Sequence, residues 1–451
     1  MATPTTTPES TTTPESTSTP ESTSTPAIPT QGKPTDEPRS FRLLGLPLEL
    51  TERAAGCPFA PATRLTELST TGPVHRVDGV NGDDLWVVTG HAEARAVLSD
   101  PRFSSDLTRS TVAMSRLPEQ IRDQLLSPRN RAGNFLGMDA PQHTRYRKLL
   151  TGQFTVRRMR QLEPRIAEIV TEHLDALIAA GPTADLVSAF ALPVPSLVIS
   201  ELLGVDYADR GTFQQRTAKL LNLDTPLDEV VEQSEALREF MRALIRAKRA
   251  KPTDDLLSGL VHADPDNPLT DDELVGMANL LLIAGHETTA NMLALGTFAL
   301  LEHPDQLALL RDDPALTATA VEELLRFLTI LHLGIRRTPL EEVELAGHRI
   351  PPGANVLISA QMANLDEEQY EDPTTLDLTR PRASHLAFGH GIHQCLGQQL
   401  ARVEMTTAFT ELLRRLPGLR LAVPADQVPL RENMAIYGVH ELPVTWDAAR
   451  A

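Results

Sequence analysis

A run of mostly apolar residues between Thr270 and Leu301 is the strongest structural signal in the chain. Thr270 and Glu273 have the spacing of a capping box, which favours a helix that begins here, and His303-Pro304 ends the pattern. At a rise of 1.5 Å per residue, the predicted helix is roughly 45–50 Å long. Because so long an apolar helix would leave much hydrophobic surface in water if one side were exposed, we expect it to cross the middle of its domain.

Helical patterns also dominate the rest of the chain from residue 41 onward, with short strand-like runs such as Leu85 to Thr89. No second shift in composition, linker or repeat interrupts this region. Hydrophobic residues make up 41% of the chain, which is enough for a sizeable buried core. We therefore expect one domain over residues 41–451, mainly α with small β-sheets.

The first 40 residues differ sharply from this domain. They repeat Pro-Glu-Ser-Thr with a period of six and contain almost no large apolar side chains. Such a segment cannot offset the entropy lost on ordering, so we expect residues 1–40 to be a disordered tail. A solubilising extension and a segment that binds a partner are both compatible with this composition.

Charge and cysteine usage narrow the function classes. A net charge of −18 argues against binding of nucleic acid, whose phosphates attract Lys and Arg. Cys57 and Cys395 lie far apart in different contexts, which disfavours a disulfide framework and favours a reducing compartment. The N-terminus has no basic stretch followed by an apolar one, and polar residues interrupt the longest apolar segment. We expect a cytoplasmic protein that does not span a membrane.

Residues 388–397 form a glycine-punctuated loop that leads into a helical pattern from about Leu396 to Leu413. Cys395 therefore stands where a loop becomes a helix, and amides at a helix start stabilise an anionic sulfur. A small buried hydrophobe is one alternative for this cysteine. A hydrolase nucleophile, with His393 as its partner, is another and would need no cofactor.

The haem-binding loop of the cytochrome P450 family is similar to the string Phe388-Gly389-x-Gly391-x-His393-x-Cys395-x-Gly397. The resemblance implies a cytochrome P450 fold, in which a long central helix lies over a buried haem. It implies that Cys395 is the metal ligand, an axial thiolate whose electron donation favours O–O cleavage. The cofactor would be noncovalent haem b, because the chain has no Cys-x-x-Cys-His sequence. Phe388, Gly389, His393 and Gly397 would contact it, and Cys57 has no assigned role.

An acid and two hydroxyls interrupt the central helix in the sequence Ala284-Gly285-His286-Glu287-Thr288-Thr289. A kink stabilised by threonine hydrogen bonds to backbone carbonyls would explain them without function. The sequence is also similar to the oxygen-activation motif of P450s. That resemblance implies that Glu287 and Thr288 are catalytic and relay protons without flooding the pocket, and that Ala284 and Gly285 lie against the haem.

Glu323 and Arg326 share a face of a predicted helix and can form a charge-assisted pair. They resemble the Glu-x-x-Arg motif of P450s, which is structural. The third arginine of that network usually comes from a Pro-x-Arg-Phe-like segment, but this chain reads Pro373-Thr-Thr-Leu376. We expect Arg380 or Arg382 to substitute for it.

The two haem propionates would need cationic or hydrogen-bonding partners to offset their desolvation. By family position, the candidates are His143, Arg147, Arg337 and His393. Each could equally be an ordinary exposed or helix-end residue. The segment from Thr144 to Arg160 has no acid and six basic residues, namely Arg145, Arg147, Lys148, Arg157, Arg158 and Arg160. We expect this basic run to contribute to a docking surface for an acidic ferredoxin, although a plain solvated helix face remains an alternative.

The resemblance spans Leu43 to Trp446 and is closest to actinobacterial P450s. By position it implies an apolar pocket wall that comprises Leu280, Ile283, Ala284, Leu333, Gly334, Met434, Ala435 and Ile436. The segments from Phe103 to Leu136 and from Leu220 to Asp228 would form a mobile lid. The resemblance favours a macrolide or other polyketide as substrate, with vitamin-D-like sterols and small drug-like compounds as competitors.

The predicted function is a monomeric monooxygenase that hydroxylates or epoxidises a small apolar organic substrate. It would use dioxygen and electrons from a ferredoxin and its ferredoxin reductase. A haem-thiolate peroxygenase and a non-catalytic haem-based sensor or ligand-binding protein are alternatives. The Glu287-Thr288 pair disfavours both, since neither a peroxide-driven nor an inert protein requires a proton relay.

Overall fold

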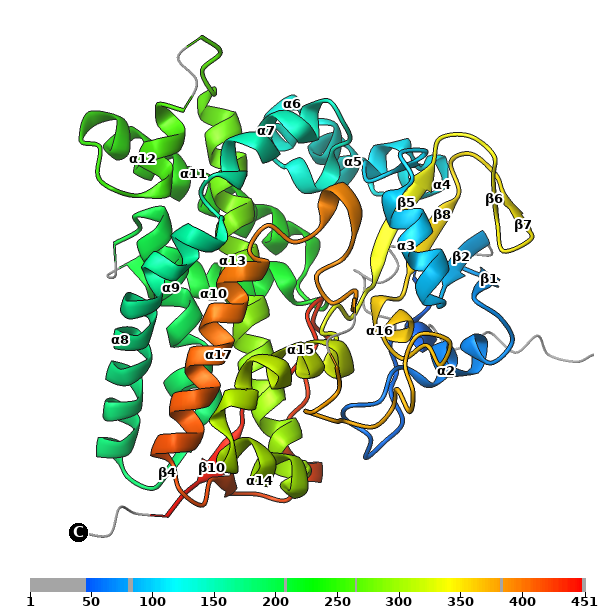
Figure 1. Cartoon of the computed structure of the whole chain (residues 1–451). Helices are drawn as coiled ribbons and strands as arrows, with labels where there is room; N and C mark the ends of the chain where they lie inside the picture. The colour runs from blue at the N-terminus through cyan, green and yellow to red at the C-terminus, as the bar shows by residue number, and fades with distance from the viewer. Residues whose placement is uncertain (1–45, 80–83, 207–208, 264–265, 382–383, 448–451) are drawn as a thin grey trace, which may run out of the picture. The chain divides into compact units, whose positions relative to one another are not determined.

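A computed structural model of the chain describes residues 46–79, 84–206, 209–263, 266–381 and 384–447. The expected tail at residues 1–40 and the candidate arginine at position 382 lie outside the described residues. The described residues fall within one compact unit, Glu37–Ala451. This unit is mainly helical with small sheets (Figure 1), as the sequence predicts.

The central helix α13 extends from Asp271 to Glu302. Its N-cap is Thr270, and the side chains and backbone of Thr270 and Glu273 make both hydrogen bonds of the predicted capping box. Most of the helix is buried, including the polar residues at its centre. Helix start, length and burial are therefore confirmed. Among the residues that the structure describes, no helix is both long and apolar enough to cross a bilayer.

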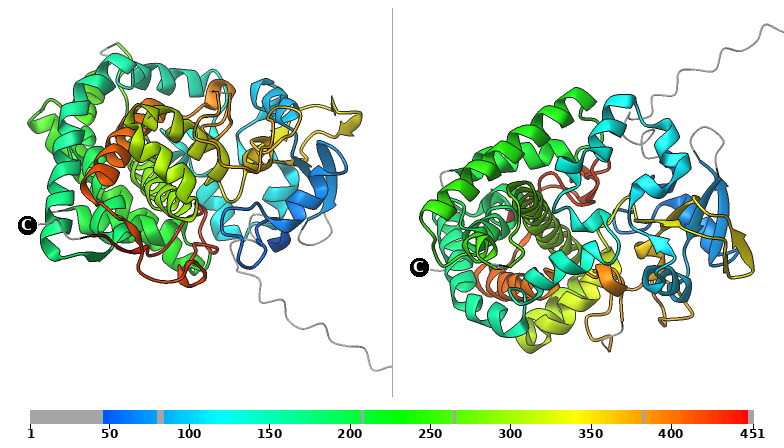
Figure 2. Two further views of the ribbon diagram at one scale, coloured as in Figure 1. Left: turned by 60° about the horizontal axis from the view of Figure 1, so that its bottom comes forward. Right: turned by 90° about the horizontal axis from the view of Figure 1, so that it is seen from above.

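Other helices enclose α13 (Figures 1 and 2). It packs against α9 (Pro193–Leu203), α11 (Leu227–Ala250) and α17 (Gln398–Arg415), while α17 also packs against α8 (Val156–Ala180). Their apolar faces meet in one hydrophobic cluster. Because other helices surround α13, its apolar side chains are buried on nearly every side. A helix with only one apolar stripe would place polar side chains against these neighbours.

A five-stranded sheet lies beside this helical part. Its strand order is β1 (Val74–Asp78), β2 (Asp84–Val88), β8 (Asn355–Ile358), β5 (Ile335–Pro339) and β3 (Phe103–Ser104). The pair β2–β8 is parallel and the other pairs are antiparallel. Strand β2 agrees within one residue with the strand predicted from sequence. The sheet and helix α3 (His91–Ser99) form a second hydrophobic cluster.

Shorter elements complete the unit. Two small sheets contain β4 (Thr183–Asp185), β10 (Pro443–Thr445) and β9 (Arg420–Leu421), and β6 (Val343–Leu345) with β7 (His348–Ile350). The remaining α-helices are α2 (Thr63–Ser69), α4 (Thr111–Arg116), α5 (Glu119–Leu126), α6 (Pro128–Arg131), α7 (Gln142–Thr151), α10 (Arg210–Leu221), α12 (Leu256–Val261), α14 (Pro304–Asp312), α15 (Thr317–Leu328) and α16 (Ala360–Ala363).

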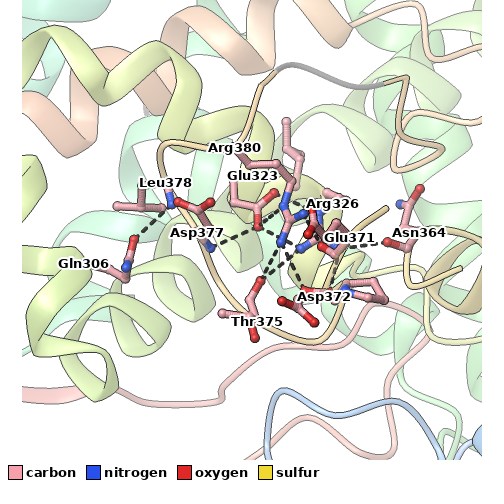
Figure 3. Close-up of polar contacts among 12 residues, drawn as sticks. Gln306, Glu323, Arg326, Asn364, Glu371, Asp372, Thr375, Asp377, Leu378 and Arg380 are labelled. Carbon is pink, nitrogen blue, oxygen red and sulfur yellow. Dashed lines mark hydrogen bonds and ion pairs between the residues drawn. The ribbon is translucent and has the colours of Figure 1, made fainter. Parts of the chain in front are cut away.

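Glu323 and Arg326 on α15 form the predicted pair in the core (Figure 3). The Arg326 Nε and Nη2 groups donate to the two carboxylate oxygens of Glu323 at 2.8 and 2.7 Å. Arg380 Nε donates to Glu323 Oε1 at 3.2 Å, so Arg380 supplies the expected third arginine. Arg326 also donates to the carbonyls of Asn364 and Pro373, both at 2.8 Å. The network thus fastens the irregular segment that precedes the Cys395 loop onto α15.

Candidate active site

A cavity of about 710 Å³ lies between the central helix and the Cys395 loop. Segments 105–138, 329–337 and 387–405 supply most of its other walls. The cavity brings together most of the site residues that are predicted from the sequence. Those in its lining are Arg147, Leu280, Ala284, Gly285, Thr288, Gly334, Arg337, Phe388, Gly389, His393, Cys395 and Gly397.

The backbone of the Cys395 loop explains its glycines. Gly389 and Gly391 have φ angles of 68° and 73°, a left-handed conformation that glycine adopts without steric cost. A Cβ atom at Gly391 would also lie 2.3 Å from the Leu98 carbonyl oxygen, closer than any side chain allows. The turn lets the Cys395 N–H donate to the Phe388 carbonyl at 2.8 Å. Loop and helix start therefore hold the sulfur at the cavity wall.

Cys395 is accessible where it lines the cavity, although protein atoms surround its thiol closely. Burial raises the pKa of this thiol. The backbone N–H groups of Gly397 and Gln398 and the charges of Arg147 and Arg402 act in the opposite direction. A protein-bound thiol of this kind becomes an anion when a metal ion coordinates it. The site thus has the donor set for a single thiolate ligand to iron.

A cluster of basic side chains borders the same cavity. His143 on α7 lies next to His393, with ring centroids 4.2 Å apart. Both ring nitrogens of His143 and Nε2 of His393 are buried without a hydrogen-bond partner among the described residues. Arg337 on β5 is buried and donates to the Arg336 carbonyl, and Arg147 donates to the Gln394 carbonyl at 2.5 Å. Four groups from three separate segments thus converge, as the resemblance implies.

The pKa shifts within this basic cluster indicate that it needs an anionic partner. Burial, followed by the charges of Arg337, His143 and Arg147, lowers the pKa of His393 to about 3. Burial and Arg147 likewise lower the pKa of His143. The charge of Asp139 acts in the opposite direction on His143 and Arg337, while its carboxylate accepts hydrogen bonds from residues 104 and 105. Buried cations and unpaired donors are costly unless an anion joins them. Two carboxylates on a flat, otherwise apolar group satisfy this need, so the residues present fit a haem with its propionates here and its iron at Cys395.

At the centre of α13, Thr288 faces the cavity together with Ala284 and Gly285. The Thr288 hydroxyl donates to the Ala284 carbonyl at 2.8 Å, which is the backbone hydrogen bond considered as a structural alternative. A Cβ atom at Gly285 would lie 2.7 Å from the Ile199 side chain, so α9 and α13 approach each other closely beside this motif. The hydroxyl is accessible from the cavity and can exchange its backbone acceptor for another partner.

Glu287 is buried but is not among the residues that line the cavity. Its Oε2 lies 3.0 Å from Nη2 of Arg431 and accepts a hydrogen bond from Asn291 Nδ2 at 3.3 Å. Arg431 belongs to the C-terminal segment and is not among the site residues predicted from the sequence. No local pattern could have found it, because the two residues meet only in the folded chain. The adjacent acid and alcohol therefore have different surroundings.

The expected apolar wall is only partly in the cavity lining. Leu280, Ala284 and Gly334 line the cavity, whereas Ile283 packs into the main hydrophobic cluster. Leu333 borders a separate small pocket. Met434 is buried, and bridges at Met434 and Ile436 join this segment to Asn222 and Leu331. The residues that lie outside the lining are Ile283, Leu333, Met434, Ala435 and Ile436.

The first predicted lid segment contributes a polar wall that the sequence did not reveal. Arg131 donates through Nη1 and Nη2 to the two carboxylate oxygens of Asp106 at 3.1 and 2.7 Å. Both residues line the cavity and tie together the two ends of the segment between them. The second expected lid segment, from Leu220 to Asp228, supplies none of the described lining residues. Glu404 on α17 also lines the cavity, and burial raises the pKa of its carboxyl well above the usual value.

The basic run between Thr144 and Arg160 does not act as one surface. Arg145 is ion-paired with Glu273 at 2.5 Å, and Arg147 lines the cavity. Lys148, Arg157 and Arg160 are exposed, and Arg158 is half-buried. The candidate docking surface is therefore smaller than the run itself, and comprises the C-terminal half of α7 and the first turns of α8.

Known proteins resemble this chain over most of its length. A model of the cytochrome P450 family matches residues 82–444. Pentalenic acid synthase of Streptomyces avermitilis is 47% identical over 391 residues, covering 86% of this chain and 95% of that protein. Vitamin D3 dihydroxylase of Streptomyces griseolus is 44% identical over 393 residues, with coverage of 86% and 95%. The crystal structure of CYP105P1 in complex with filipin I shares 44% identity, with a TM-score of 0.83 over 90% of this chain and 100% of that one. The chain belongs to the cytochrome P450 family, whose members are haem-thiolate monooxygenases.

Proposed function

We propose that this enzyme hydroxylates or epoxidises an apolar secondary metabolite, using dioxygen and electrons from a ferredoxin. The observation that carries the proposal is that Cys395 and Thr288 line one cavity. Cys395 would hold the iron, and Thr288 would supply a proton donor to the same cavity. A single cavity that joins a metal ligand, a proton donor and apolar walls suits oxygen insertion into unactivated carbon.

The chain's own residues have three tasks in this proposal. Cys395 binds the haem iron, and the cluster of His143, Arg147, Arg337 and His393 orients the haem through its propionates. When bound, the haem supplies the redox and dioxygen chemistry. Apolar residues such as Leu280 and Ile330 exclude bulk water from the cavity. Exclusion of water matters because protons delivered by bulk water would lead to release of peroxide in place of product.

Thr288 would hold the proton that oxygen activation consumes. Its hydroxyl donates to the Ala284 carbonyl, so delivery requires it to rotate away from that acceptor. Glu287 would resupply the proton from the adjacent position on α13. Because Glu287 is ion-paired with Arg431, resupply requires that pair to loosen during turnover. We propose this relay as the catalytic role of the acid and alcohol.

For the substrate, we propose a macrolide or another polyketide. The relatives include a pentalenic acid synthase, a vitamin D3 dihydroxylase and an enzyme crystallised with filipin I, which supports a binding site for apolar natural products. Residues of α13 such as Leu280 and Ala284 supply an apolar part of the cavity lining, and the Asp106–Arg131 pair offers polar contacts. Sterols resembling vitamin D and small drug-like compounds remain the competing substrate classes.

A spectroscopic screen tests the proposal. The purified holoenzyme is titrated with macrolactones, vitamin-D-like sterols and drug-like compounds, and a low-to-high spin shift reports substrate that displaces water from the iron. We expect macrolactones to give the largest shift and a product with one added oxygen when ferredoxin and its reductase are supplied. A spin shift without product would indicate a sensor. Product formed with peroxide but never with ferredoxin would indicate a peroxygenase. Either outcome would contradict the proposal.

A further inference from the structure

Arg402 on α17 lies in a cluster that the proposed reaction leaves without a role. Its Nε donates to Glu322 Oε1 at 2.6 Å and its Nη2 to Glu322 Oε2 at 3.0 Å, a two-point contact with α15. Its Nη1 donates to the backbone carbonyl of Gln398 at 3.3 Å and to the side-chain oxygen of Gln398 at 3.0 Å. Every nitrogen of the guanidinium group is therefore held within the chain. Such a fork-like contact fixes orientation as well as charge.

The same guanidinium reaches the Cys395 loop from two directions. Its central carbon lies 4.6 Å from the centre of the Phe388 ring, within the range of a cation–π contact. The Phe388 carbonyl accepts the Cys395 N–H at 2.8 Å. Gln398, which Arg402 holds, directs its own backbone N–H to the Cys395 sulfur and lowers the pKa of that thiol. Arg402 thus contacts two residues that each contact the metal ligand.

The cluster is charged and largely shielded from solvent. The Glu322 and Arg402 side chains are 14% and 26% exposed. Burial raises the pKa of Glu322, but hydrogen bonds from His385 and Arg402 outweigh it and lower the value to about 2. The His385 ring also packs beside Phe388, with centroids 5.9 Å apart. An ionised pair therefore persists at neutral pH next to the thiolate loop.

We propose that Arg402 is a positioning residue for the thiolate and that its ion pair with Glu322 sets how readily the haem accepts its first electron. The inference rests on iron ligation by Cys395. Hydrogen-bond donors and positive charge near a thiolate reduce its electron donation to iron and favour the reduced state. Arg402 supplies the charge and holds Gln398 in place, while Glu322 partly cancels the charge. Removing Arg402 should therefore disfavour reduction of the haem, and removing the charge of Glu322 should favour it.

Reductive titration of the holoenzyme, without substrate or dioxygen, tests this inference. We expect Arg402→Met to decrease the equilibrium constant for one-electron reduction on the order of tenfold, which corresponds to about 59 mV. Glu322→Gln leaves the arginine charge uncompensated, so it should increase that constant. Arg402→Lys keeps the charge but loses the fork, and should fall between wild type and Arg402→Met. The measurement involves no oxygen insertion, so its failure is distinguishable from failure of the proposed reaction.

Arg414→Met is the matched control, because Arg414 pairs with Glu411 on the same helix at an exposed position. We expect it to leave the reduction equilibrium unchanged. The inference is overturned if Arg402→Met behaves like this control, or if Arg402→Met and Glu322→Gln shift the equilibrium in the same direction, as loosened packing alone would do. If Arg402→Met does not retain haem, Glu322→Gln decides: an increase supports the inference and an unchanged value overturns it.

Discussion

Glu287 and Arg431 form an ion pair 3.0 Å apart inside the protein, with only 4% and 10% of their side chains exposed. The pair ties the middle of α13 to the C-terminal segment. It also fixes the carboxylate that stands next to Thr288 in the sequence. The proposed catalytic acid, Glu287, thus depends for its position on a residue from the far end of the chain.

Truncating Arg431 should destabilise the fold through this pair. Arg431→Met leaves a buried carboxylate without its partner, which we expect to lower the free energy of unfolding by about 3–5 kcal/mol. Combining it with Glu287→Gln removes the unpaired charge and should restore part of the loss. Urea denaturation of the two single variants and the double variant measures the coupling. Strictly additive losses would show that the pair does not couple the two segments.

Thr288→Ala should uncouple electron use from product formation. Without the hydroxyl, proton delivery fails, so we expect more peroxide released per electron consumed while substrate binding persists. Thr297→Ala is the matched control, because Thr297 makes the same type of backbone hydrogen bond on α13, to Leu293 at 2.8 Å, and does not line the cavity. Peroxide assays with each variant measure the effect. Unchanged coupling in Thr288→Ala would contradict the relay.

The two arginines that contact Glu323 should contribute unequally to the free energy of unfolding. Arg326→Ala leaves a carboxylate that is 3% exposed without its two-point partner, and we expect a loss of about 3–5 kcal/mol together with poor haem retention. Arg380→Ala removes one 3.2 Å contact to Glu323 and three hydrogen bonds to the backbone carbonyls of residues 371, 372 and 375. Its side chain is 12% exposed and Glu323 keeps its two-point contact with Arg326, so the cost should be smaller, about 1.5–3 kcal/mol. Thermal or urea unfolding of the holoenzyme compares them. Equal losses would contradict this ranking.

Stability should depend on pH through Glu322. Its pKa is lowered from 4.5 to about 2 in the folded chain, so the unfolded state binds its proton first as the pH falls. Its contribution is therefore complete above about pH 4.5 and disappears as the pH falls toward 2. Comparing Glu322→Gln with wild type cancels the effects of other acids. We expect the stability difference between them to shrink on acidification from pH 6 to pH 3, and a constant difference would refute the assignment.

Exposed cations on α7 and α8 should govern the reaction with ferredoxin. Reversing Lys148, Arg157 and Arg160 to Glu removes attraction to an acidic partner, so the rate of haem reduction by ferredoxin should fall at least tenfold at low ionic strength. Added salt should reduce the difference in reduction rate between wild type and this variant, since salt screens exposed charges. Arg349→Glu, at an exposed position of strand β7, is the control. Equal rates in all proteins would exclude this surface.

Much of the site could be predicted because its signals are local. The capping box of α13, the Glu323–Arg326 pair and the glycines around Cys395 each involve residues a few positions apart, where helix geometry or a turn dictates the contact. The candidate propionate cluster could be predicted only through the family resemblance, because His143, Arg337 and His393 come from separate segments. The pocket wall was harder still, and the segment from Met434 to Ile436 lies outside the cavity lining.

The sequence by itself determined the helical class and the central helix, since periodicity carries that information. Through the family resemblance of a short motif, it also singled out Cys395 as the proposed iron ligand. Only the tertiary structure decided which charges meet. Arg431 reaches Glu287, Arg402 reaches Glu322, and Arg131 reaches Asp106, each pair joining different elements. Contacts of this kind leave no period in the chain, because they depend on how helices pack and on which buried charge must find a partner.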